Sequence, residues 1–191
     1  MEYGGTDSLF NYLKAKKYHC LAEEEARQVF RQAVEGVDYL HKKNIAHRDI
    51  KLENILLNES QTVKLIDFGF SIQSQKGQLL NIYCGTPSYM SPELAMKKNY
   101  QGWHADVWAL GVLLYVLLCG RFPFVGTADS IRNLVTKSIF IKGMNDRELF
   151  QRISQGKFDV PPHVSPDARA LLYKIIRVNP HDRPSCETVH Y

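Results

Sequence analysis

The sequence predicts a mainly α fold of the α+β class: a helical bundle around a buried central helix, with one small β-hairpin. Residues 22–43 carry apolar side chains at helical spacing, and residues 107–119 form an almost unbroken apolar run. Two short β-type runs lie between these segments. The chain has 191 residues, of which 45% are hydrophobic and 23% charged, and this is enough for one compact domain with a sizeable core.

Residues 22–43 form the first clearly predicted helix. Acidic side chains at residues 23–25 and basic ones at residues 42–43 suit the helix dipole, because acids stabilise the N-terminal end and bases the C-terminal end. Five apolar residues recur on one face, which we expect to pack against the core: Ala26, Phe30, Ala33, Val37 and Leu40.

The predicted hairpin consists of residues 55–57 and residues 63–66. A polar stretch at residues 58–61 separates these two β-type runs. After the hairpin, a long polar segment with few periodic apolar residues continues to about residue 90. We expect an extended loop there, and loops of this length inside a compact domain usually carry function.

Residues 107–119 are the most apolar stretch of the chain. As a helix of about 13 residues this stretch would be ~20 Å long, whereas a bilayer core needs ~30 Å. We therefore expect a helix buried on all sides and no insertion into a membrane. From about residue 146 onward the pattern is helical, with interruptions at four prolines: Pro161, Pro162, Pro180 and Pro184.

Charge and cysteine content narrow the classes of partner. The net charge of +4 is small and the basic residues are scattered, so nucleic acid and membrane surfaces are not indicated as partners. The first five residues, Met-Glu-Tyr-Gly-Gly, resemble neither a signal peptide nor a transit sequence. The four cysteines are far apart and form no Cys-x-x-Cys pair, which argues against a zinc site or a disulfide framework. We therefore expect an intracellular location, in the cytoplasm or the nucleus.

Short polar motifs flank the predicted hairpin. Residues 47–54 read His-Arg-Asp-Ile-Lys-Leu-Glu-Asn, and residues 67–69 read Asp-Phe-Gly. Because a hairpin returns its two ends to the same place, we expect four side chains to meet at one edge of the sheet: Asp49, Lys51, Asn54 and Asp67. Two carboxylates and an amide oxygen suit Mg²⁺ that shares its ligands with a phosphate chain, and the lysine suits the charge of a transferred group.

These motifs resemble, in order and spacing, the signature of eukaryotic protein kinases. They are followed by Gly-Thr-Pro at residues 85–87, Ser-Pro-Glu at 91–93, Asp-Val-Trp-Ala-Leu-Gly at 106–111 and His-Asp-Arg-Pro at 181–184. Any one motif is weak alone, whereas the ordered series is specific. Residues 1–191 resemble the large C-terminal lobe of a serine/threonine protein kinase, and are most similar to the calcium/calmodulin-dependent and AMP-activated group.

The resemblance implies roles in the transfer of the ATP γ-phosphate to serine or threonine hydroxyls of protein substrates. Asp49 would accept or orient the proton of the substrate hydroxyl, and Lys51 would contact the γ-phosphate. Asn54 and Asp67 would hold Mg²⁺, while Thr86 would hydrogen-bond near Asp49 and Lys51. Because phosphoryl transfer has a loose transition state, positioning and charge neutralisation matter more than a strong base.

The resemblance also implies contacts around the site. Glu93 and Arg183 would form a buried ion pair. Asp106 would brace the backbone around His47, and that histidine would stack in the core beside Phe68. The adenine of ATP would meet Met1 as the gate of its pocket, backbone groups of Glu2 and Gly4, and a floor made by Leu56 and Ile66.

Four further residues have less distinctive expectations. Glu53 is equally compatible with a contact to ribose or to a basic substrate side chain and with a solvated glutamate. Tyr89, Trp108 and Tyr115 are most simply core aromatics.

The chain departs from the family pattern in two segments. No glycine-rich loop and no Val-Ala-x-Lys strand occur in it, so we expect that the small N-terminal lobe is absent from residues 1–191 and that this chain alone is inactive. A rival hypothesis is a pseudokinase-like interaction module, although the intact acidic residues favour the enzyme. Residues 125–144 are longer than usual, and their Ile-Phe-Ile triplet at 139–141 fits either a packed surface loop or a dock for a regulatory protein.

The residue before Asp49 indicates how the loop is controlled. In many kinases the arginine equivalent to Arg48 pairs with a phosphothreonine two residues before the cysteine of Cys-Gly-Thr-Pro. That position is Ile82 here, which cannot be phosphorylated. We expect an enzyme that is active without phosphorylation of this loop or that uses a nearby site, with Tyr83, Ser71 and Ser74 as candidates; alternatively Arg48 bonds only to loop carbonyls.

Overall fold

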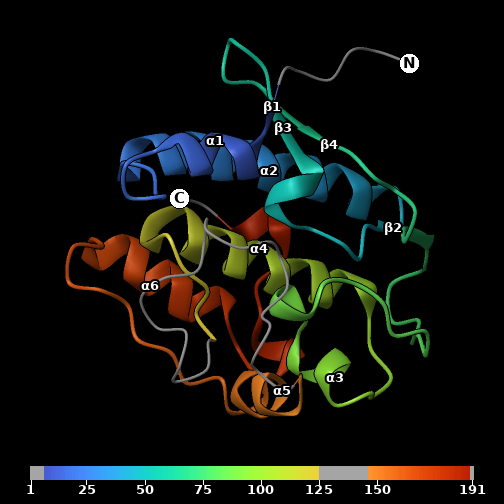
Figure 1. The fold of residues 1–191 in the computed structure, drawn as a ribbon. Helices are drawn as coiled ribbons and strands as arrows, with labels where there is room; N and C mark the ends of the chain where they lie inside the picture. The colour runs from blue at the N-terminus through green and yellow to red at the C-terminus, as the bar shows by residue number, and fades with distance from the viewer. Residues whose placement is uncertain (1–6, 125–145, 190–191) are drawn as a thin grey trace.

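The fold is a helical bundle with two small sheets, as expected for a mainly α chain. The computed structural model describes residues 7–124 and 146–189 (Figure 1). Its α-helices are α1 (Leu9–Ala15), α2 (Glu23–Lys42), α3 (Pro92–Ala95), α4 (Gly102–Cys119), α5 (Asp146–Gln155) and α6 (Pro166–Ile175). Its strands are β1 (Asp7–Ser8), β2 (Ile45–Ala46), β3 (Ile55–Leu57), β4 (Val63–Leu65) and β5 (Ile72–Gln73), and its short 3₁₀ turns are η1 (Leu52–Asn54), η2 (Pro87–Tyr89), η3 (Pro180–Asp182) and η4 (Cys186–Thr188).

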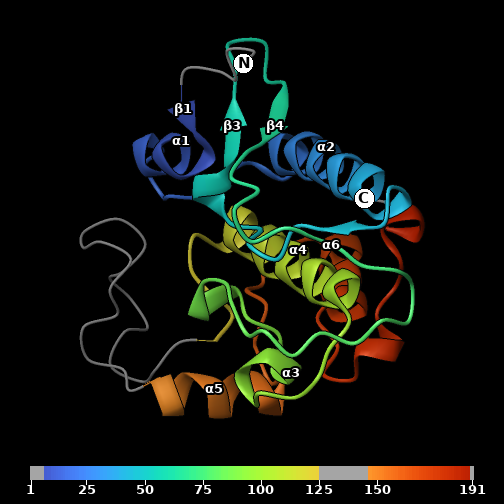
Figure 2. The ribbon, with the colours of Figure 1, turned by 90° about the vertical axis from the view of Figure 1, so that its right-hand side faces the viewer.

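Helix α4 is the central element. Figures 1 and 2 show it between a layer of α1, α2 and the three-stranded sheet on one side and α3 and α5 on the other. Nearly all of its residues are buried, so the expected central helix is confirmed. It begins five residues before the apolar run that predicted it and is about 27 Å long. By length and composition it is the one helix among the described residues that would suit a membrane, but 83% of it is buried inside the protein, as in a core helix.

Helix α2 packs against α4 through the face that the periodicity predicted. All five predicted core residues of this helix are buried. Its first turn is joined to α6, because the Ser165 hydroxyl donates to Glu23 Oε1 at 2.5 Å and the Ser165 amide donates to Glu23 Oε2 at 3.1 Å. The same hydroxyl accepts a hydrogen bond from the Ala168 amide and so caps α6.

The predicted hairpin is confirmed as β3 and β4, which pair antiparallel with Ile55 opposite Leu65. Two further strand pairings were not predicted from the sequence. Strand β1 adds a third strand beside β3, and β2 pairs with β5 in a separate two-stranded sheet. Strands of two residues carry no period that a sequence pattern can reveal. The second sheet joins the segment before residue 47 to the loop that follows the hairpin.

The two polar loops of the site are therefore held at defined places. We name residues 47–54 the first loop and residues 67–90 the second loop. The second loop also forms an isolated bridge between Leu80 and Tyr100 and rests on a small cluster of Leu80, Leu94, Tyr100 and Ala105, separate from the main core. The predicted helices after residue 146 are present as α5 and α6. Residues 125–144, which include the triplet at 139–141, lie outside the described residues.

Candidate active site

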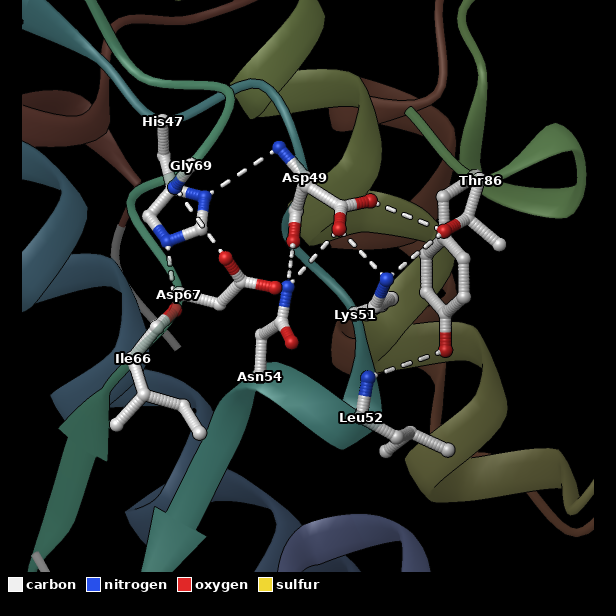
Figure 3. A network of polar contacts seen from close by, with 10 residues as sticks. His47, Asp49, Lys51, Leu52, Asn54, Ile66, Asp67, Gly69 and Thr86 are labelled. Atoms are coloured by element: carbon white, nitrogen blue, oxygen red, sulfur yellow. Dashed lines mark hydrogen bonds and ion pairs between the residues drawn. The ribbon is translucent and has the colours of Figure 1, made fainter. Parts of the chain in front are cut away.

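Asp49 is the central acceptor of the polar network of the site (Figure 3). Its side chain is almost fully buried. Oδ2 accepts from Lys51 Nζ at 2.6 Å and from Asn54 Nδ2 at 3.0 Å, and Oδ1 accepts from the Thr86 hydroxyl at 3.0 Å. Three donors to one buried carboxylate satisfy its oxygen atoms where water cannot reach them, and such charge-assisted hydrogen bonds are strong.

Lys51 and Thr86 join the first loop to the second. Lys51 Nζ donates to the Thr86 hydroxyl at 3.2 Å, so Thr86 contacts both residues that it was expected to meet. Thr86 follows Gly85, whose backbone has φ +112° and runs against the Arg48 carbonyl. A Cβ at Gly85 would come within 3.0 Å of that oxygen and would be strained at this φ, so glycine lets the second loop approach the first.

Figure 3 shows Asn54 and Asp67 on the same side of Asp49; Asn54 is buried, whereas Asp67 is exposed. Asn54 Nδ2 also donates to the Asp49 carbonyl at 2.9 Å, which fixes the amide so that its oxygen is the group left to accept or ligate. Asp67 is exposed and has φ +61°, and its Oδ1 accepts from the Gly69 amide at 3.2 Å.

These two oxygen donors fit a hard cation such as Mg²⁺. Within residues 7–124 and 146–189 no group of three or more His, Cys, Asp or Glu residues is arranged to hold a metal. The donor set therefore fits Mg²⁺ that takes further ligands from phosphate and water rather than an all-protein cage.

Asp106, in α4, braces the first loop as expected. Its Oδ2 accepts from the His47 amide at 2.9 Å, and its Oδ1 accepts from the Arg48 amide at 2.8 Å. A third partner of Asp106 was not predicted: the His41 imidazole, whose Nε2 lies 2.9 Å from Oδ2. Arg48 has φ +67°, which an L-residue adopts only when its surroundings enforce it.

His47 is fully buried, as expected of a packed core residue. Its Nδ1 accepts from the Asp49 amide at 3.3 Å, so Nε2 carries the proton and donates to the Ile66 carbonyl at 3.1 Å. The expected stacking with Phe68 is wrong in its geometry. The ring centroids are 5.1 Å apart but the planes are tilted by 53°, and Phe68 is 47% exposed rather than in the core.

Glu93 and Arg183 form the expected buried ion pair. Two guanidinium nitrogens each donate to one carboxylate oxygen at 2.7 Å. Arg183 also donates to the carbonyls of Arg177, His104 and Val178, so its donors are satisfied within the protein. Burial alone would raise the pKa of the Glu93 carboxyl, but hydrogen bonds and charge from Arg183 outweigh burial and lower that pKa below its ordinary value.

The expected adenine contacts are described only in part. Leu56 and Ile66 are both partly exposed, and the hairpin register places them on the same face of the sheet. Met1, Glu2 and Gly4 lie outside the described residues. Glu53 differs from a fully solvated glutamate, since its Oε2 is shielded from solvent and has no hydrogen-bond partner in the described part of the chain.

Two tyrosines have polar roles that sequence patterns did not reveal. Tyr89 is a core aromatic as expected, as are Trp108 and Tyr115, yet its hydroxyl also accepts the Leu52 amide at 3.3 Å. Tyr100 accepts a hydrogen bond from Arg48 Nη1 at 3.3 Å. Neither residue belongs to a motif with distinctive spacing, so only the folded chain identifies them.

Comparison with known proteins gives one consistent result. Residues 1–190 match the family described as "Protein kinase domain". The "NUAK family SNF1-like kinase 1" proteins of Mus musculus and Homo sapiens are each 39% identical to the chain over 189 residues, which is 99% of its length. The chain spans about a quarter (26%) of the length of these two relatives.

Proposed function

This chain belongs to the protein kinase domain family, and we propose that it transfers the γ-phosphate of ATP to serine or threonine hydroxyls of protein substrates. The relation to the AMP-activated group, which the motifs indicated, is confirmed by the identity to the two SNF1-like kinases. The observation that carries the proposal is the Asp49 carboxylate, which is buried, triply hydrogen-bonded and joined to Lys51 and Thr86 across the two loops.

Asp49 would orient the substrate hydroxyl and take its proton. Its side chain is already held by Asn54 and Thr86, so little reorganisation is needed when the hydroxyl arrives. Lys51 lies 2.6 Å from Asp49 and would place its ammonium against the transferred phosphoryl group. Thr86 would hold both side chains in this arrangement through its single hydroxyl.

Asn54 and Asp67 would hold Mg²⁺, which would neutralise and orient the phosphates when it is bound together with ATP. Leu56 and Ile66 would form the floor of the adenine site, together with Met1 and backbone groups of Glu2 and Gly4. The serine/threonine preference is supported by Lys51 and by the Gly-Thr-Pro sequence at residues 85–87, which the resemblance links to that class.

We further propose that turnover needs a small lobe with a glycine-rich loop and a phosphate-binding lysine, since neither motif occurs in residues 1–191. An intracellular location, in the cytoplasm or the nucleus, is supported by the four cysteines, all of which are free thiols. A regulatory protein partner is consistent with the exposed apolar side chains of the second loop, Leu79 and Ile82.

Two substitutions in the intact protein test the proposed roles. Asp49→Asn should lower kcat about a hundredfold or more, because it removes the acceptor for the hydroxyl proton, while nucleotide affinity stays within about twofold. Asp67→Asn should also remove turnover, and in addition should weaken Mg²⁺-dependent nucleotide binding about tenfold or more, because it removes a metal ligand.

Asp167→Asn is the matched control, since this aspartate is exposed at the start of α6, away from both loops. Peptide phosphorylation gives kcat, and calorimetric titration of ATP with and without Mg²⁺ gives the affinities. Equal nucleotide affinities in Asp49→Asn, Asp67→Asn and wild type would contradict the assigned roles. Undiminished turnover in Asp49→Asn would contradict the proposed reaction.

A further inference from the structure

Tyr100 connects the two loops of the site although it belongs to neither. It lies two residues before α4 and is 2% exposed. Its hydroxyl accepts from Arg48 Nη1 at 3.3 Å and donates to the Ile82 carbonyl at 2.9 Å. Its backbone pairs with Leu80 in both directions, at 2.7 and 3.1 Å. One residue therefore contacts the first loop through its side chain and the second loop through its side chain and main chain.

We infer that Tyr100 is a positioning residue for phosphoryl transfer: its hydroxyl holds the second loop against Arg48, and so holds Thr86 against Asp49. The inference rests on the proposed function for its catalytic consequence. The part of the inference that concerns the placement of the loop rests on the contacts of Tyr100 with Arg48, Ile82 and Leu80.

Arg48 is connected to the second loop at two places, directly at Phe70 and through Tyr100 at Ile82. Its Nε donates to the Phe70 carbonyl at 2.6 Å, near the start of the second loop, and its Nη1 reaches Ile82 through Tyr100. Its backbone amide is held by Asp106 and it directly precedes Asp49. The guanidinium thus has two neutral oxygen acceptors, the Phe70 carbonyl of the second loop and the Tyr100 hydroxyl, and its position is fixed relative to Asp49.

Hydrogen bonds must hold the middle of the second loop in place, because most of its apolar side chains are exposed and bury little surface. Leu79 is 59% exposed, Ile82 63% and Tyr83 38%. Leu80 is the buried exception and is the residue that pairs with Tyr100. Side chains that face water contribute little burial, so the Ile82 carbonyl contact has a large share in the position of this segment.

The path from Ile82 to Thr86 is short and closely confined. A Cβ added to Gly85 would lie 3.0 Å from the Arg48 carbonyl oxygen, so the two backbones are close here. The next residue, Thr86, contacts Asp49. If the Ile82 carbonyl is released, the loop loses the contact that precedes this close approach. The Thr86 hydroxyl would then be less often at Asp49, which weakens preorganisation of the site.

The Tyr100 hydroxyl is suited to accept and donate at once. Burial raises its pKa, and the hydrogen bond from Arg48 lowers the pKa by less, so the pKa lies above the ordinary tyrosine value. The hydroxyl is therefore protonated at neutral pH and can donate to Ile82 while it accepts from Arg48.

The test is Tyr100→Phe in the intact protein, which keeps the ring among Leu80, Leu94 and Ala105 and removes only the hydroxyl. Amide hydrogen exchange in residues 80–86 should become about tenfold faster, because one hydrogen bond of the loop is lost and Arg48 and Ile82 each lose a partner. For peptide phosphorylation, kcat should fall about tenfold while KM for ATP stays within about twofold, since Tyr100 is not among the residues proposed to contact ATP.

Tyr115→Phe is the matched control, because it removes another tyrosine hydroxyl that donates to a backbone carbonyl, that of Asp159 at 2.7 Å. A double-mutant cycle with Arg48→Ala measures whether the two substitutions are coupled in their effect on amide exchange of residues 80–86. Loss of stability alone would not produce such coupling. If Tyr100 acts through Arg48, the double variant should exchange residues 80–86 no faster than Arg48→Ala alone.

Wild-type exchange in Tyr100→Phe, or the same increase in Tyr115→Phe, would overturn the inference. Additive effects of Tyr100→Phe and Arg48→Ala would also overturn it. If the intact wild type lacks turnover while Tyr100→Phe still exchanges faster, the proposed function fails and the placement of the loop by Tyr100 is supported.

Discussion

At the scale of single residues, buried carboxylates organise the site. Asp49 and Asp106 are both almost fully buried, and each accepts three hydrogen bonds. Asp106 binds backbone amides and so fixes the conformation of the first loop. Asp49 binds side chains and so fixes the positions of Lys51, Asn54 and Thr86. A carboxylate without such donors would be costly to bury, because its oxygen atoms would have no hydrogen-bond partners.

The Glu93–Arg183 pair leads to a prediction about stability. Glu93→Gln should destabilise the protein by about 3–5 kcal/mol at pH 7, because it leaves the buried Arg183 guanidinium without its counter-charge. The free energy of unfolding from urea titration measures this. Glu35→Gln is the control, since the Arg31–Glu35 pair is exposed and should contribute less than about 1 kcal/mol.

The same pair predicts how stability depends on pH. Because the Glu93 pKa is lowered in the folded state, the folded protein holds its negative charge more strongly than the unfolded chain. This contribution is present at neutral pH and is lost as pH falls below the ordinary glutamate pKa of about 4.3. The stability difference between wild type and Glu93→Gln should therefore narrow in acid. A constant difference from pH 7 to pH 3 would contradict the ionic origin of the pairing.

At the scale of elements, the packing of α4 against α6 depends on close approach at Gly111. A Cβ at this position would lie 2.7 Å from Ile175 Cγ2 and 2.8 Å from Ile176 Cγ1. Both neighbours are β-branched and have little freedom to move aside. The helices can therefore approach this closely only because position 111 has no side chain.

Gly111→Ala should destabilise the protein by about 1–3 kcal/mol, because overpacking outweighs the gain in helix propensity. Gly36→Ala is the matched control in the middle of α2, where the nearest atom would be the terminal methyl Leu65 Cδ1 at 3.1 Å. We expect that variant to stay within about 1 kcal/mol of wild type. Thermal unfolding of both variants measures the difference, and equal midpoints would show that the contact at Gly111 relaxes freely.

At the scale of the whole molecule, the site lies at the edge of the helical lobe beside the small sheet. Asp67 is exposed there, and Leu56 and Ile66 are only partly covered by the described residues. In the proposed function, the described residues would provide the groups that address the hydroxyl, the metal and one side of the adenine. They do not include a glycine-rich loop to enclose the phosphates.

This arrangement predicts that residues 1–191 alone phosphorylate a peptide at least about a thousandfold more slowly than the same residues preceded by a protein kinase small lobe, because an open cleft leaves the phosphates unpositioned. Circular dichroism would verify that both proteins are folded. Asp49→Asn in the longer protein is the control for contaminating activity. Comparable turnover by the two wild-type proteins would refute the need for the small lobe.

Much of this protein could be predicted from local sequence. The amphipathic face of α2, the apolar α4 and the hairpin of β3 and β4 follow from periodicity, because burial selects apolar residues at regular spacing. The meeting of Asp49, Lys51 and Asn54 follows from their placement in one short loop, and the approach of Asp67 follows from the return of the hairpin. These features depend on residues that are close in sequence or on one simple turn.

Other features were decided only when the chain folded. The two-residue strands β2 and β5, the positive φ at Arg48 and Asp67, and the tilt of His47 against Phe68 have no periodic signal. The contacts of Tyr100 with Arg48 and Ile82 join residues 52 and 18 positions apart. Such contacts depend on how α4 and the second loop come to lie beside the first loop, and side-chain hydrogen bonds between distant segments form only after packing has set that distance.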